Sequence, residues 1–155
     1  MRIWASPMFA LAASLCAAQG AFAHDAHNHY AAGEPATPSA TVKTVDIVMS
    51  DADGKMTFTP DRLEVQRGEL VKFVIHNSGM TRHEFVLGDR AENSEHARMM
   101  LEMPDMLHDD PNGKSVEPGK TATLSWRFTK KGEFEFACLL PGHYEAGMHG
   151  VVSVK

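Results

Sequence analysis

Three side chains that bind soft or borderline metal ions lie close together near the C-terminus. Cys138, His143 and Met148 are each separated by four intervening residues, which include a Pro-Gly pair and a further glycine. A segment so rich in Pro and Gly cannot continue as a helix and is expected to form a loop. Thiolate, imidazole and thioether together suit copper, whereas zinc rarely takes methionine and hard cations prefer oxygen. The spacing therefore predicts a copper site on one loop.

A trigonal copper site needs a second imidazole, and His83 is the best candidate. It begins an alternating run over residues 83–87, directly after a predicted turn over residues 77–80. On a strand, His83 shares a face with Phe85 and Leu87 and points towards the core, where an unpaired imidazole is costly. A lone histidine is more typically structural or solvated. His76 lies on the polar face of the preceding strand and ranks well below His83 as a ligand.

A spaced pattern of further residues accompanies the four candidates. It consists of Asn77, His83, Pro118-Gly119, Gly132, Phe134, Phe136, Cys138, Pro141-Gly142-His143, Gly147-Met148 and Gly150. In this pattern the chain resembles the cupredoxins, the blue-copper family of plastocyanin, azurin, auracyanin and rusticyanin, over residues 42–155. Its Cys-to-His spacing is similar to that of auracyanin and rusticyanin. The His- and Met-rich additions described below make it look most like the periplasmic cupredoxins of bacterial copper-resistance systems.

The resemblance implies an all-β fold, a Greek-key β-sandwich of about eight strands with a short helical insertion. It also implies one type 1 copper ion. The implied equatorial ligands are His83, Cys138 and His143, and the weak axial ligand is Met148. The resemblance places two residues around these ligands: Glu84, whose backbone N–H would donate to the Cys138 sulfur, and Asn77. His143 is expected to be the ligand nearest solvent.

The segments that carry these residues show the period of two that is typical of strands. Inward-facing positions are predicted at Val45, Ile47, Met49, Val71, Phe73, Ile75, Ala122, Leu124, Trp126, Phe128, Phe134 and Phe136. Cys138 continues the face of Phe134 and Phe136, so the thiol points inward at the end of its strand. The following Pro-Gly turn then places His143, and Gly147 lets Met148 return beneath the metal.

Residues 89–116 interrupt the alternation and predict a helical insertion that is rich in methionine and histidine. The helix is expected to open at Asp89 and to end near Met103, because Pro104 follows. Its candidate secondary copper ligands are His96, Met99, Met100, Met103, Met106 and His108. Met99, Met103 and Met106 recur at helical spacing. They indicate either a methionine face packed on the barrel or a patch of soft ligands that passes Cu(I).

The first 23 residues have the pattern of a cleaved signal peptide. A positive charge at Arg2 precedes an apolar run over residues 8–18 that is too short to span a bilayer, and Ala21-Phe22-Ala23 fits the small-x-small cleavage rule. Export to the periplasm is therefore predicted. Cleavage removes Cys16, so that Cys138 is the one remaining thiol. A buried inert cysteine is the alternative, but His and Met at ligand spacing favour a metal thiolate.

Residues 24–41 are small, polar and Pro-bearing, which predicts a flexible tail ahead of a cupredoxin domain over residues 42–155. His24, His27 and His29, with the amino group freed by cleavage, form a candidate low-affinity copper-collecting arm. The alternative is a solvated linker whose histidines have no role.

Charge and composition narrow the choice of partners. The formal net charge is −5, and loss of Arg2 makes the mature chain more acidic, which argues against nucleic acid or anionic membrane as a partner. No further apolar run is long enough for a membrane span, and one monomeric domain is expected. Candidate partners are the copper ion itself, copper efflux or oxidase proteins, or a redox protein.

An enzyme is not expected. A multicopper oxidase needs histidines flanking the cysteine, but the neighbours here are Ala137 and Leu139, and a binuclear copper centre needs two cysteines. Two functions remain. The first is copper tolerance through binding, buffering or transfer of copper, with Cu(I)/Cu(II) redox as an additional capacity. The alternative is a soluble electron-transfer cupredoxin that shuttles electrons between redox partners.

Overall fold

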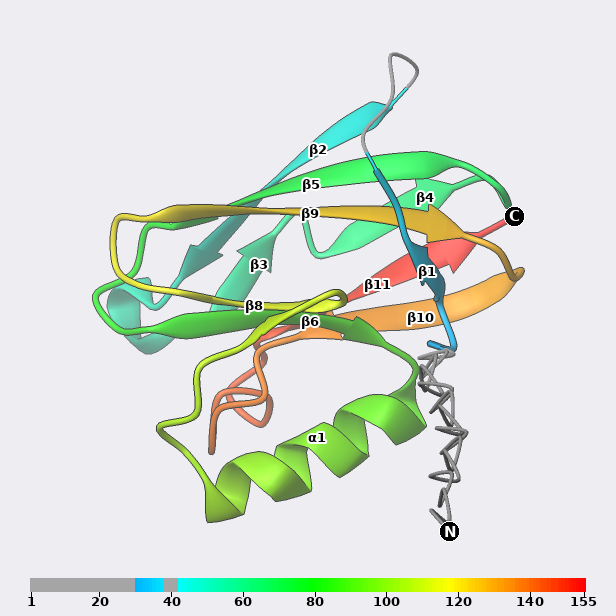
Figure 1. The fold of residues 1–155 in the computed structure, drawn as a ribbon. Coiled ribbons are helices and arrows are strands. Elements are labelled where there is room, and N and C mark those ends of the chain that lie inside the picture. The colour runs from blue at the N-terminus through cyan, green and yellow to red at the C-terminus, as the bar shows by residue number, and fades with distance from the viewer. Residues whose placement is uncertain (1–29, 38–41) are drawn as a thin grey trace, which may run out of the picture.

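The computed structural model describes residues 30–37 and 42–155, which form two packed β-sheets and one α-helix (Figure 1). The strands are β1 (Gly33–Pro35), β2 (Lys43–Ser50), β3 (Thr57–Thr59), β4 (Arg62–Val65), β5 (Leu70–Asn77), β6 (His83–Gly88), β7 (Asp109–Asp110), β8 (Gly113–Val116), β9 (Thr121–Phe128), β10 (Gly132–Ala137) and β11 (His149–Val154). A 3₁₀ turn covers Ala52–Gly54, and the helix α1 covers Arg90–Glu102. The predicted all-β sandwich with one helical insertion is confirmed. The strands in the described residues number eleven rather than about eight, because several span only two to four residues.

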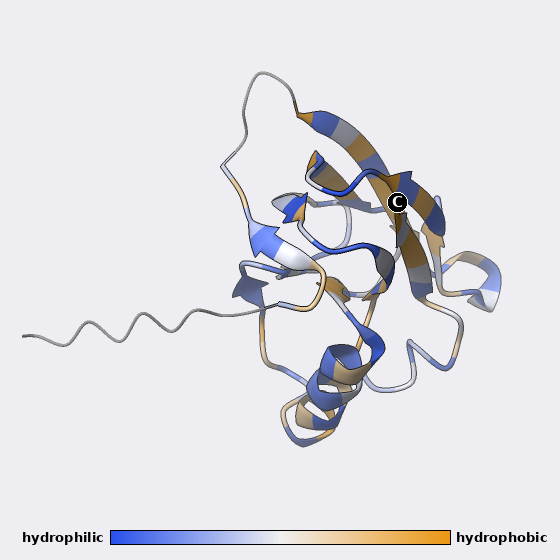
Figure 2. Cartoon of the chain, turned by 90° about the vertical axis from the view of Figure 1, so that its right-hand side faces the viewer, coloured by the Kyte–Doolittle hydropathy of each residue, from blue (hydrophilic) through white to orange (hydrophobic). Residues whose placement is uncertain are grey.

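The two sheets bury a continuous aromatic core between them. One sheet has the order β1-β9-β5-β2-β3 and the other β4-β11-β10-β6-β8-β7. Figure 2 shows the alternation of apolar and polar residues along the strands that lets each sheet turn one face inward. Phe85 stacks on Phe136 with ring centroids 5.3 Å apart, and Phe58 meets Phe136 edge-on at 5.2 Å. These aromatic contacts pack the core closely beneath the ends of β6 and β10.

The pairing of strands brings distant segments to one edge of the sandwich. β10 runs antiparallel to β6, with Phe136 opposite Leu87. The start of β6, where His83 lies, therefore meets the end of β10, which Cys138 follows. β2 runs parallel to β5, with Met49 opposite Asn77, so the segment after β2 lies beside the turn that leads to His83.

The helix begins and ends as its sequence predicts. Asp89 and Glu92 form a reciprocal capping box, in which the Glu92 N–H donates to Asp89 Oδ1 at 2.8 Å and the Asp89 N–H donates to Glu92 Oε2 at 3.0 Å. Met103 is the C-terminal cap, directly before Pro104. α1 packs against β6 and β10, on the face of their sheet that is turned away from the core (Figure 1). Every residue of β6 is consequently buried.

The methionine face expected on the helix is not the face that packs. Asn93 and Met100 are the buried helix residues, while Met103 is 43% exposed and Met99 and Met106 are half-buried. Asn93 and Met100 are seven residues apart, so they lie two turns apart on one face. Around the helix, Met99 lies about 100° and Met103 about 60° from Met100, because each helical residue rotates by about 100°. Met99 and Met103 therefore lie off the packed face, whereas Met106, beyond the end of the helix, packs partly buried against the core. The three residues do not form one packed face, which was the first of the two alternatives.

Part of the predicted flexible tail belongs to the sandwich. β1 pairs with β9, with Gly33 opposite Phe128, and Ala32 is fully buried. Tyr30 meets Trp126 edge-on with ring centroids 5.3 Å apart. The prediction of a tail is therefore wrong for residues 30–35. A run of three residues is too short to show a period of two, and a proline is tolerated because β1 is an edge strand.

The remaining N-terminal predictions lie outside the described residues. These are the signal peptide over residues 1–23 and the histidines at 24, 27 and 29. In the part of the chain that the structure describes, no helix is long and apolar enough to cross a membrane.

Candidate metal centre

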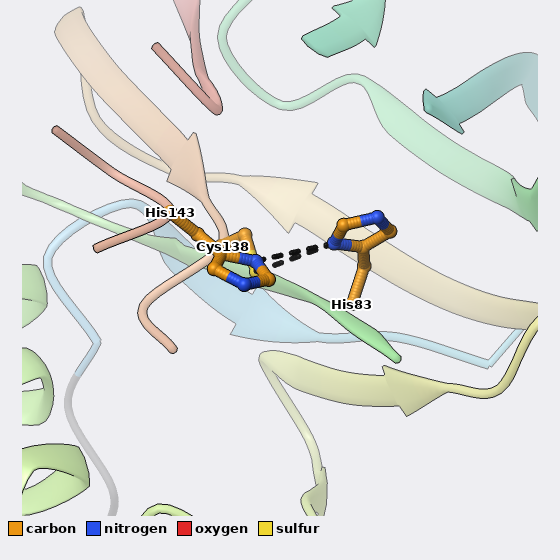
Figure 3. A group of neighbouring side chains, drawn as sticks. All are labelled: His83, Cys138 and His143. Carbon is orange, nitrogen blue, oxygen red and sulfur yellow. Dashed lines mark hydrogen bonds between the residues drawn. The ribbon is translucent and has the colours of Figure 1, made fainter. Parts of the chain in front are cut away.

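His83, Cys138 and His143 gather at the edge where β6 begins and β10 ends (Figure 3). Cys138 Sγ lies 3.3 Å from His143 Nδ1 and 4.0 Å from His83 Nδ1, and the two Nδ1 atoms are 3.3 Å apart. A point equidistant from three atoms with these separations lies roughly 2 Å from each, close to the length of metal–imidazole and metal–thiolate bonds. The three donor atoms thus have the spacing that one metal ion requires.

Backbone hydrogen bonds close the loop that carries three of the four candidates. The Cys138 N–H donates to the Met148 carbonyl, and the Met148 N–H donates to the His143 carbonyl, each at 3.0 Å. Gly147 makes this return with φ near +100°, a conformation that side chains disfavour. The Met148 side chain is fully buried in the core. The backbone of the loop therefore holds Met148 directly beside Cys138.

The sulfur of Cys138 is shielded from solvent and receives backbone hydrogen bonds from Glu84 and Leu140. The Glu84 N–H donates to Cys138 Sγ at 3.3 Å, the contact that the family resemblance implied. Burial raises the pKa of the Cys138 thiol to about 12, although the Glu84 N–H acts in the opposite direction by stabilising the thiolate. Without a metal, the thiol is protonated at neutral pH. A metal ion that binds the sulfur must displace this proton.

The His83 and His143 imidazoles are neutral and can donate an electron pair to a metal ion. Burial lowers the pKa of His83 below its ordinary value, and the nearby His143 adds to this effect. Burial likewise lowers the pKa of His143. His83, Cys138 and Met148 are fully buried, whereas His143 is partly exposed. His143 is thus the candidate ligand nearest solvent, as expected.

Asn77 holds the turn that leads to His83. Its side-chain amide donates to the carbonyls of Thr81 and Val116, each at 2.8 Å, and its side-chain oxygen accepts from the Gly79 N–H at 2.8 Å. Asn77 is fully buried, so these three hydrogen bonds satisfy a side chain that would otherwise be costly to bury. It positions the ligand turn rather than contacting the donor atoms.

The sequence analysis missed Asp51, whose carboxylate lies beside Nε2 of the His83 imidazole. Asp51 Oδ2 is 3.5 Å from His83 Nε2, and the same carboxylate accepts hydrogen bonds from the Met80 and Thr81 backbone N–H groups, each at 2.9 Å. These bonds lower the Asp51 pKa to about 2. A side chain on Gly79 would place its Cβ 2.9 Å from His83 Nε2, so glycine is needed there. No local pattern signals this contact, because only the parallel pairing of β2 and β5 creates it.

The insertion brings together only some of the predicted secondary ligands. His96, His108 and Glu84 form a second group of potential metal ligands, and Met100 Sδ lies 3.1 Å from His108 Nε2. Burial lowers the pKa of His96 to about 4, so its imidazole is neutral at pH 7. The sequence analysis also missed the Glu84 side chain as a member of this group, because it considered only the Glu84 backbone N–H.

Comparison with known proteins identifies the family. Residues 45–155 match the family described as copper binding proteins, plastocyanin/azurin family. The match covers most of the chain, so the chain belongs to this family of cupredoxins. The cluster of one thiol and two imidazoles, together with this membership, identifies the cofactor as a type 1 copper ion.

Several relatives are similar over most of their length. The chain is 49% identical over 136 residues to the copper-resistant cuproprotein CopI of Rubrivivax gelatinosus. The aligned region covers 88% of this chain and 79% of that protein. The chain is 40% identical over 152 residues to the copper-resistant cuproprotein CopI of Pseudomonas aeruginosa, covering 79% of this chain and 82% of the relative. An auracyanin from Roseiflexus castenholzii has a similar fold, with a TM-score of 0.62 at 22% identity, covering 76% of this chain and 99% of that one.

Proposed function

We propose that the protein is a periplasmic type 1 copper-binding protein that acts in copper tolerance, with copper bound by His83, Cys138, His143 and Met148. The observation that carries the proposal is the spacing of the Cys138, His83 and His143 donor atoms around one point. The two relatives that are 49% and 40% identical are both copper-resistant cuproproteins, which supports the same role here.

The fold supports tight binding with little rearrangement. Copper bound at this site supplies one-electron redox chemistry between Cu(I) and Cu(II). The aromatic core beneath β6 and β10 and the closed 138–148 loop keep the donor atoms in place, so the site reorganises little. The Glu84 N–H partly compensates the negative charge of the Cys138 thiolate once the proton has left.

Exposed thioethers beside the site favour copper handling. Met80, on the turn before His83, is 89% exposed, and Met103 at the end of α1 is 43% exposed. Arg82 joins these two segments, because its Nη2 donates to the Pro104 carbonyl at 2.6 Å. Soft sulfur ligands at the surface suit the capture of Cu(I). The proposed route for copper passes these residues before reaching the partly exposed His143.

Localisation and the absence of catalysis belong to the same proposal. The predicted signal peptide over residues 1–23 supports export. The relatives named above are described as copper-resistant cuproproteins and not as enzymes. We propose a binding protein whose partners are copper ions and the copper efflux or oxidase proteins that remove them.

A soluble electron carrier is the second candidate. The observation that favours it is the partly exposed His143, which follows the exposed Pro141-Gly142 turn, since an exposed ligand can be reached by a redox partner; Leu139 and Leu140 are buried. A carrier would need the same four ligands. The two functions therefore have to be separated in cells.

Deletion of the gene and complementation with variants test the proposal. We expect deletion to sensitise cells to copper, wild type to restore tolerance, and Cys138→Ser to fail. His76→Gln is the matched control, because His76 is an imidazole on β5 whose Nδ1 bonds Thr121 Oγ1 at 3.0 Å, away from the site. Full rescue by Cys138→Ser would contradict the proposal. Impaired respiration at ordinary copper, with tolerance unchanged, would instead identify an electron carrier.

A further inference from the structure

A second group of metal-binding side chains lies between α1 and the outer face of β6. Glu84 comes from β6, His96 from α1, and His108 from the segment before β7. Glu84 Oε2 is 4.0 Å from His96 Nε2, and Glu84 Oε1 is 3.8 Å from His108 Nε2. The side chains of Glu84, His96 and His108 are 0%, 16% and 3% exposed. Three charged or polar groups thus share one enclosed space.

The three side chains offer electron pairs, and Glu84 Oε1 accepts a hydrogen bond from Ser115 Oγ at 3.4 Å. His108 Nδ1 lies 2.8 Å from Asp110 Oδ2, and because a carboxylate only accepts, Nδ1 carries the proton. In a neutral imidazole, Nε2 then presents a lone pair towards Glu84 and towards Met100 Sδ. Glu84 Oε2 and His96 Nε2 are buried without a hydrogen-bond partner. Such buried polar atoms are costly, and a cation among them removes the cost.

We propose that Glu84, His96 and His108 bind a second metal ion, a divalent cation of the copper and zinc class. Two imidazoles and one carboxylate are a donor set that both Zn(II) and Cu(II) accept. Asp110 has the position of the outer carboxylate that commonly orients a metal-binding histidine. When ionised, the Glu84 carboxylate supplies half of the charge compensation that a divalent ion needs.

An access route leads to this site from the surface. His96 lines a surface hollow together with Glu92 and Glu95 of α1, whose carboxylates attract cations. The second ion therefore reaches its ligands without passing through the cluster of His83, Cys138 and His143.

Glu84 connects the two sites within one residue. Its backbone N–H donates to Cys138 Sγ at 3.3 Å, while its carboxylate faces His96 and His108. A metal ion bound to the Glu84 carboxylate would therefore act on the residue whose backbone N–H donates to Cys138 Sγ. Occupation of the second site is therefore expected to shift the absorption of the thiolate–copper bond. The existence of the second site does not depend on the proposed role in copper tolerance.

Zinc titration of the protein loaded with one equivalent of copper tests the inference. Zinc is the probe because copper binds the first site more tightly and Zn(II) has no absorption of its own. Replacing His24, His27 and His29 by glutamine in every protein removes the other imidazole cluster of the sequence. In this background we expect one equivalent of tightly bound zinc, a shifted thiolate–copper band, and an anomalous zinc peak between Glu84, His96 and His108 in a crystal.

Two variants and one control identify the ligands. Glu84→Gln and His108→Gln are expected to weaken zinc binding at least about tenfold, while His76→Gln leaves it unchanged. A retained thiolate–copper band in Glu84→Gln shows that the variant is folded and that the first site is intact. Absence of bound zinc, or zinc affinity that Glu84→Gln does not alter, would overturn the inference. Failure of the first site would appear separately, as loss of the copper band.

Discussion

At the scale of the residue, burial decides how Cys138 meets a metal. The thiol is fully buried, and its polar contacts include the Glu84 N–H, the Leu140 N–H and the two candidate imidazoles. A buried thiolate without a cation is costly, which is why the pKa of Cys138 rises to about 12. Once a metal has displaced the proton, the same burial keeps water away from the copper–sulfur bond.

The pKa of Cys138 predicts how copper affinity depends on pH. Below about pH 12 the copper-free thiol holds a proton that binding must release, so the dissociation constant should fall about tenfold for each unit of pH increase. His83 and His143 add no further protons above their lowered pKa values. Calorimetry of copper binding in buffers of different ionisation enthalpy counts the protons. A release near zero at pH 7 would show that the thiol is already ionised.

Met148→Leu tests the proposed axial contact. Leucine fills a similar buried volume, so the fold should persist at a cost below about 1.5 kcal/mol. Loss of a sulfur donor disfavours Cu(II) more than Cu(I), and we expect the reduction potential to rise while copper stays bound. A rise of about 59 mV corresponds to a tenfold change in the equilibrium constant of a one-electron couple. Voltammetry measures it, and an unchanged potential would mean that Met148 does not contact the metal.

At the scale of the element, β1 shows how a short strand can complete a sheet edge. It pairs with β9 alongside Trp126 and Phe128, and the Ala31 N–H before it donates to Glu92 Oε1 of α1 at 2.7 Å. The segment thereby joins the first sheet to the helix that packs on the second. The close pairing requires glycine at position 33, where φ is +140°.

Gly33→Ala is expected to destabilise the protein. An added Cβ would overlap the Arg127 carbonyl oxygen on β9, and such overpacking costs about 1–3 kcal/mol. Gly68→Ala is the matched control, since Gly68 also has a positive φ but open space around its Cβ, so its cost should be about 1 kcal/mol. Urea unfolding measures both. Equal losses in the two variants would show that β1 does not pair closely with β9 in solution.

At the scale of the whole molecule, the candidate ligands come from two places that are far apart in sequence. His83 opens β6, and the other three candidates lie between β10 and β11. Copper would therefore join the two segments in addition to the backbone pairing of β6 with β10. A metal that binds only the folded state stabilises it by mass action.

Copper loading should raise the unfolding temperature. At free copper 100 times the dissociation constant, the gain in unfolding free energy is about 2.7 kcal/mol. Calorimetry with and without copper measures the shift, and Cys138→Ser should show little of it because the thiolate is gone. An equal shift in Cys138→Ser would place the stabilising copper elsewhere in the chain.

Local patterns in the sequence predicted the strands, the helix and the candidate residues His83, Cys138 and His143, and the resemblance to the cupredoxins implied the sandwich and the complete ligand set. Strand alternation, the Asp89 cap and the spacing of the loop depend on neighbouring residues, so a single chain reveals them. The contact of Asp51 with His83, the pairing of β1 and the grouping of Glu84 with His96 and His108 depend on strand order and helix packing. These contacts join residues far apart in sequence. Only the tertiary structure decides them, because no period or spacing encodes which surfaces meet.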